Sequence, residues 1–138
     1  MGTIVTRALG DMSFESTMGS HRLIIDVPEA MGGKGRGPTP PELFIASLGS
    51  CVAAFIASYC GQHGIDASGL EVKVDFDKDA GPPLRLVNLH VNIHLPKVAE
   101  PDQIHQAALR HVAEHCPVHE TIHTMGTIQF DFEVGATQ

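Results

Sequence analysis

The chain has 138 residues, 43% of them hydrophobic and 18% charged, with a formal net charge of −7. This length indicates a single domain, residues 1–138, which is large enough to build a hydrophobic core without disulfides. The negative charge excludes nucleic acid or an anionic membrane as the main partner, since both favour Lys/Arg patches, and no apolar run reaches the length of a membrane span.

The first third of the chain contains short β-prone segments. Residues 3–9, 12–16 and 21–27 are separated by turn residues and predict a small antiparallel meander. A glycine-rich stretch, residues 32–38, follows as a flexible loop.

Residues 40–62 are predicted to form a helix that begins after Thr39 and carries prolines in its first turn. No charged residue occurs between Leu43 and Ser58, and the positions between the large apolar side chains are mostly small. A helix that is apolar all round is a buried one, so we expect this helix to run through the centre of the protein. Such a helix needs more cover than one small domain readily supplies.

The second half of the chain alternates strands and helices. Residues 70–77 and 88–95 alternate apolar and polar side chains and predict an antiparallel hairpin. Helices are predicted over 101–115 and 117–124, separated at Pro117. A closing strand is expected at the alternating positions Ile128, Phe130, Phe132 and Val134. The order β-β-β-α-β-β-α-α-β is an α+β pattern.

Three cysteines, an odd number, argue against a structural disulfide framework and favour free, redox-active or metal-ligating thiols. Cys51 lies within the central helix, where a small core side chain is the simplest interpretation. Cys116 lies between two helices and can cap the second one, where backbone dipoles lower the pKa of a thiol. His115 and His119 beside it could add positive charge or accept a proton.

Two motifs resemble the OsmC/Ohr family, whose name comes from osmotic induction and organic hydroperoxide resistance. The first is Gly37-Pro38-Thr39-Pro40-Pro41-Glu42-Leu43-Phe44 with the later Gly49-Ser50-Cys51, and the second is Cys116-Pro117-Val118-His119. The likeness covers nearly the whole chain. It implies an OsmC-like intertwined homodimer of α+β class, in which central buried helices are flanked by antiparallel β-sheets and both sites lie at the subunit interface.

The resemblance also implies an activity, that of a cytoplasmic thiol-dependent peroxidase acting on organic hydroperoxides. Cys51 would attack the peroxide bond and become a sulfenic acid, and Cys116 would condense with it to form a disulfide. An external dithiol, with a lipoylated protein as a candidate, would reduce that disulfide. No cofactor is implied, and Cys60 is expected to have a packing role.

The family uses a Glu and an Arg to keep the reactive thiolate charged. Glu42 matches the Glu, although its spacing to Cys51 is one residue shorter than in the Ohr branch and is more like that of the broader OsmC-like branch. Stabilisation of the helix start by charge is the simpler role for Glu42. Arg7, Arg22 and Arg36 are candidates for the Arg, and we favour Arg36 because it lies on the glycine-rich loop.

Three alternatives remain open. The first is an OsmC-like domain without fast peroxidase turnover that binds a small hydrophobic or thiol ligand at the dimer interface. The second is a metal site; His115, Cys116, His119 and His123 are close in sequence, but they lack the second ligand pair of a zinc site, so no metal is expected. The third is a Cys-His hydrolase built on Cys116.

Overall fold

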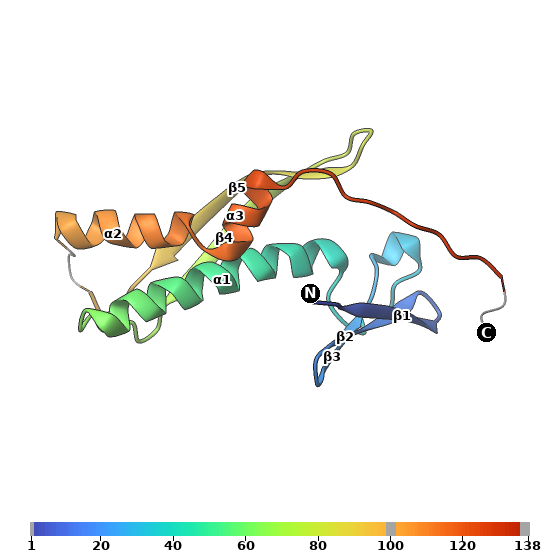
Figure 1. Ribbon diagram of the computed structural model, residues 1–138, viewed down its shortest axis with the longest axis horizontal. Coiled ribbons are helices and arrows are strands. Elements are labelled where there is room, and N and C mark those ends of the chain that lie inside the picture. Colours follow the sequence, from blue (N-terminus) through green and yellow to red (C-terminus); the bar gives the residue numbers. More distant parts are fainter. Residues whose placement is uncertain (1, 99–101, 136–138) are drawn as a thin grey trace.

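The computed structural model describes residues 2–98 and 102–135 and has an α+β architecture. Strands β1 (Val5–Gly10), β2 (Ser13–Met18) and β3 (His21–Ile25) form an antiparallel sheet in that order, which confirms the predicted meander. The sheet lies at one end of the molecule, beyond the N-terminus of α1 (Figure 1). A short 3-10 helix, Glu29–Met31, follows β3.

Helix α1 (Pro40–Gln62) is the long central element, as the sequence predicts. Strands β4 (Glu71–Asp79) and β5 (Arg85–His94) form the predicted hairpin. Helix α2 (Gln103–Glu114) begins after Asp102, whose Oδ1 accepts a hydrogen bond from the backbone N–H of His105. Position 101, included in the predicted helix, lies outside the described residues. Helix α3 (Pro117–Thr124) has the predicted bounds.

One face of α1 carries the hydrophobic core. The hairpin β4–β5 and helices α2 and α3 pack against α1 (Figure 1). The buried core residues are Leu48, Val52, Ile56, Cys60, Leu109 and Cys116. The first four recur at every fourth position of α1, so they form a single stripe along one side of the helix. Cys60 is part of this stripe and has the packing role that the sequence predicts.

The other side of α1 remains apolar and is not covered by the chain itself. Phe44 and Phe55 are exposed, and only 28% of the most apolar 18-residue window of α1 is buried. With a mean hydropathy of 1.9, this window is long and apolar enough to cross a membrane, so the expectation that no stretch reaches that length was wrong. A core helix meets the same criterion, and α1 packs against four other elements.

The predicted closing strand does not form within the described chain. Residues 125–135 have no regular secondary structure and extend away from α3 (Figure 1). The strand prediction was therefore wrong for this chain by itself. The physical reason is that a strand needs a neighbouring strand to satisfy its backbone hydrogen bonds, and none lies beside this segment in the described residues. Its apolar side chains, Ile128, Phe130, Phe132 and Val134, are between 61% and 96% exposed.

Candidate functional site: a pair of cysteines between two helices

The packing of α3 against α1 brings two cysteines together that are far apart in sequence. Cys51 lies in the middle of α1 and is half-buried, whereas Cys116 is the N-cap of α3 and has an exposed fraction of 0%. Both are free thiols, and Cys51 lies close enough to Cys116 to raise the pKa of the Cys116 thiol. The pair thus combines one thiol that solvent can reach with one that it cannot.

The surroundings of Cys116 differ from the sequence prediction in one respect. Its Sγ accepts a hydrogen bond from the backbone N–H of His119 at 3.4 Å, as expected of an N-cap. Burial nevertheless raises the pKa of the Cys116 thiol, and the neighbouring Cys51 raises it further, against the smaller opposing effect of the helix N–H groups. The prediction of a lowered pKa was therefore wrong, because desolvation outweighs the helix terminus.

Glu42 makes the hydrogen bonds of a helix cap. Its Oε1 accepts from the backbone N–H of Thr39 at 3.0 Å and from the Thr39 hydroxyl at 2.8 Å. These bonds lower the pKa of the Glu42 carboxyl. The pair forms a capping box at the start of α1. This is the simpler of the two predicted roles, and a catalytic role for Glu42 stays a prediction.

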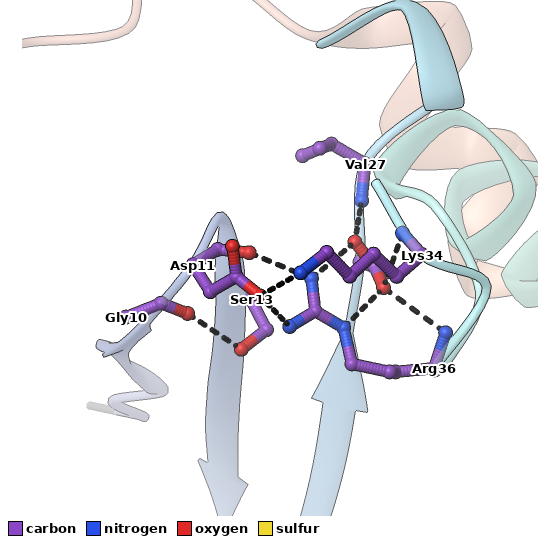
Figure 2. A network of polar contacts seen from close by, with 7 residues as sticks. Gly10, Asp11, Ser13, Val27, Lys34 and Arg36 are labelled. Atoms are coloured by element: carbon purple, nitrogen blue, oxygen red, sulfur yellow. Dashed lines mark hydrogen bonds and ion pairs between the residues drawn. The ribbon is translucent and has the colours of Figure 1, made fainter. Parts of the chain in front are cut away.

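Arg36 joins the glycine-rich loop to the N-terminal sheet (Figure 2). Its Nε donates to Asp26 Oδ2 at 2.8 Å, and its Nη2 donates to the backbone carbonyl of Asp11 at 2.7 Å. In the part of the chain that the structure describes, its hydrogen bonds and ion pairs go to these two residues. Its predicted role beside Cys51 would require it to exchange these partners or to act across an interface.

The other two candidate arginines lie on the sheet. Arg22 Nε lies 4.0 Å from Glu15 Oε1. Arg7 lies opposite the same Glu15 in the backbone register of β1 and β2. Neither has a described contact with Cys51.

Asp26, which sequence reasoning missed, is the buried partner of Arg36. Its exposed fraction is 1%, and its carboxylate also accepts backbone N–H bonds from Val27, Lys34 and Arg36. These bonds hold the pKa of the Asp26 carboxyl far below its usual range, and the side-chain hydrogen bond from Arg36 has the largest effect. The sequence feature that could have indicated a buried acidic residue is the position of Asp26 directly after the apolar run Leu23-Ile24-Ile25.

We expect Asp26→Asn to lower the Tm by several degrees at pH 7, because it leaves a buried amide opposite Arg36. The folded pKa of Asp26 is depressed, so its stabilising effect is complete above the unfolded pKa of about 3.9 and is lost as pH falls through the folded value. The Tm difference between wild type and variant should therefore narrow below about pH 4. Thermal melts followed by circular dichroism, from pH 7 to below about pH 4, measure this Tm difference. Asp66→Asn, at an exposed turn, is the control and should have little effect; a pH-independent difference for Asp26→Asn would contradict the argument.

The histidines near Cys116 do not assemble into a metal centre. The rings of His111 and His115 stack at 4.0 Å, and those of His119 and His123 lie parallel at 6.0 Å. Across residues 2–98 and 102–135, no group of three or more His, Cys, Asp or Glu side chains is arranged to hold a metal ion.

A cleft of about 860 Å³ lies between α1, β5 and α2 and is lined by both apolar and polar side chains. Leu48, Val52 and Leu109 contribute to its walls and also belong to the core cluster that contains Cys116. His119 borders the cleft, whereas Cys51 does not.

These observations define the class of the protein: an α+β chain in which a central apolar helix and a short helix bring two free thiols together. The model of the OsmC-like protein family matches residues 33–131, and the chain belongs to that family. No protein of curated function matches the sequence significantly.

Solved structures with the same fold include several members of this family. A Psychrobacter arcticus protein, whose name suggests a role in osmotic stress and detoxification, is 28% identical over 90% of both chains, with a TM-score of 0.77. An organic hydroperoxide resistance protein OsmC from Legionella pneumophila is 23% identical over 90% of both chains, with a TM-score of 0.61. An OsmC-like protein from Mycoplasma pneumoniae is 20% identical over 91% of this chain and 89% of that chain, with a TM-score of 0.69.

Proposed function

We propose that this protein is a thiol-dependent peroxidase that reduces organic hydroperoxides. The observation that carries the proposal is the meeting of two free thiols, with Cys51 half-buried and Cys116 buried beside it. Membership of the OsmC-like family and the hydroperoxide resistance named for one of the structural neighbours support the same activity.

The chemistry follows from the different exposure of the two thiols. The thiolate of Cys51 attacks one oxygen of the hydroperoxide, the O–O bond breaks, and the alcohol leaves with a proton while Cys51 becomes a sulfenic acid. The thiol of Cys116 then attacks the Cys51 sulfur, which forms the disulfide and releases water. An external dithiol reduces the disulfide by exchange and is itself oxidised. Free thiols and this reductant fit the reducing cytoplasm.

A homodimer is part of this proposal. The exposed apolar side of α1 and the exposed apolar side chains of residues 128–134 give the chain two surfaces that a second copy can cover. The resemblance to the intertwined dimers of the family supports this arrangement, in which the sites lie between the subunits. A partner chain could then supply the Arg and Glu that this chain uses elsewhere.

The second candidate function is an OsmC-like domain that binds a small hydrophobic or thiol ligand at the dimer interface without fast turnover. The contacts of Arg36 with Asp26 and of Glu42 with Thr39 favour it, because neither side chain is free to activate Cys51 in the described chain. The two candidates differ in whether peroxide is consumed.

The test is the loss of cumene hydroperoxide, compared with hydrogen peroxide, after addition of fully reduced protein. We expect the organic peroxide to disappear faster than hydrogen peroxide, with two thiols lost and one disulfide formed per chain. Mass spectrometry should locate that disulfide at Cys51 and Cys116. If cumene hydroperoxide is consumed no faster than by free cysteine at the same concentration, the peroxidase function is rejected. The ligand-binding domain is then the remaining candidate function.

A further inference from the structure

Cys116 must lose its proton in a place where its charged form is disfavoured. A thiolate, not a thiol, is the attacking species in disulfide formation. The Cys116 side chain has no exposure to solvent, and burial raises the pKa of its thiol. The proton therefore needs an acceptor within the protein, close to Sγ.

His119 stands in the position from which such an acceptor can reach Cys116. It is the third residue of α3, and its backbone N–H contacts Cys116 Sγ at 3.4 Å. In the same chain, the third residue of α1, Glu42, turns back to its N-cap and lies 2.8 Å from the Thr39 hydroxyl. His119 occupies the same position relative to Cys116 as Glu42 does relative to Thr39. Its imidazole makes no hydrogen bond to Cys116 Sγ in the structure, and a change of its side-chain rotamer would bring it toward the capping sulfur.

The imidazole of His119 also has a free nitrogen on its buried side. Its Nδ1 is buried and makes no hydrogen bond within the described residues. The Nδ1 atoms of three other histidines are engaged: His63 with the Tyr59 carbonyl, His105 with the Tyr59 hydroxyl and His115 with the His111 carbonyl. A buried polar atom without a partner is costly, so its presence calls for a role.

We propose that His119 is the general base of the resolving step, accepting the Cys116 proton at Nδ1 as the thiol attacks Cys51. This inference rests on the proposed function and names a further catalytic residue in it. The Cys116 sulfur forms a bond to the Cys51 sulfur, the S–O bond of the sulfenic acid breaks, and the proton held by the imidazole passes to the departing hydroxide as water. His119 ends the step neutral, and no further oxidant or reductant is needed.

The resolving step can be measured without any peroxide. An aromatic disulfide that releases thionitrobenzoate reacts first with the accessible Cys51, and Cys116 then attacks the mixed disulfide and releases a second thionitrobenzoate. We expect His119→Ala to slow the second release on the order of 100-fold and to leave the first unchanged. Added imidazole should restore part of the second rate. If His119→Ala folds poorly, His119→Gln takes its place, because glutamine keeps a polar side chain but offers no base. The second release should then be slowed to a similar extent in His119→Gln.

The matched control is His123→Ala, on the same helix and with its ring parallel to that of His119; both releases should keep the wild-type rate. A second release at the wild-type rate in the His119 variants would overturn the inference, as would equal slowing of both releases. Failure of the peroxidase proposal has a different signature, namely normal thionitrobenzoate kinetics in a wild-type protein that does not consume cumene hydroperoxide.

Discussion

Cys51→Ser is expected to abolish the consumption of cumene hydroperoxide, with a rate loss of about a thousandfold or more, because it removes the only nucleophile proposed for the peroxide. Cys116→Ser should instead consume one peroxide per chain and stop, because the sulfenic acid on Cys51 has no thiol to condense with. Stopped-flow measurement gives the amount of peroxide that each variant consumes per chain. Dimedone labelling identifies the sulfenic acid in Cys116→Ser. The two variants thus separate the attacking thiol from the resolving one.

The matched control for these variants is Cys60→Ser. Cys60 is a free thiol on the same helix as Cys51, but it is fully buried in the core stripe of α1. We expect this variant to lose stability by about 1–3 kcal/mol, because a hydroxyl replaces a small apolar group in the core, and to keep its activity per folded molecule. Loss of activity in Cys60→Ser with unchanged folding, or full turnover in Cys116→Ser, would contradict the assigned roles.

Local patterns predicted those elements whose stability is local or whose partner is next in the chain. The uncharged stretch of α1, the capping residues around Thr39 and the alternation along β4 and β5 all belong to this kind. The segment with Ile128 and Phe130 carries an equally clear alternation but forms no strand, because its pattern says nothing about where a pairing strand lies.

The features of the candidate site also differ in whether the sequence could predict them. The spacing of Cys51 and Cys116 does not show that they meet; the resemblance implied it, and the packing of α3 on α1 brings it about. The raised pKa of Cys116 and the attachment of Arg36 to Asp26 depend on burial and on contacts between loops. No periodic pattern in the sequence indicates either feature, so the raised pKa of Cys116 could not be predicted from the residues.

The C-terminal segment offers the sharpest test of the proposed dimer. Its apolar residues occupy every second position from Ile128 to Val134. The polar residues Gln129, Asp131 and Glu133 lie between them, and Thr127 continues the same alternation before Ile128. An extended segment with this pattern has one apolar face. If that face packs on a second copy, charge placed on it should weaken the dimer, while charge placed on the opposite face should not.

We therefore expect the double variant Phe130→Asp, Phe132→Asp to raise the dimer Kd by about a hundredfold or more. Burying one Phe is worth about 1.5–3 kcal/mol, and each factor of ten in Kd corresponds to about 1.4 kcal/mol. The control, Thr127→Asp with Gln129→Asp, adds the same charge to the same segment on its polar face and should keep the wild-type Kd. Sedimentation equilibrium measures all three proteins. A monomeric wild type would refute the dimer, and equal weakening by both double variants would mean that charge repulsion, rather than the apolar face, controls association.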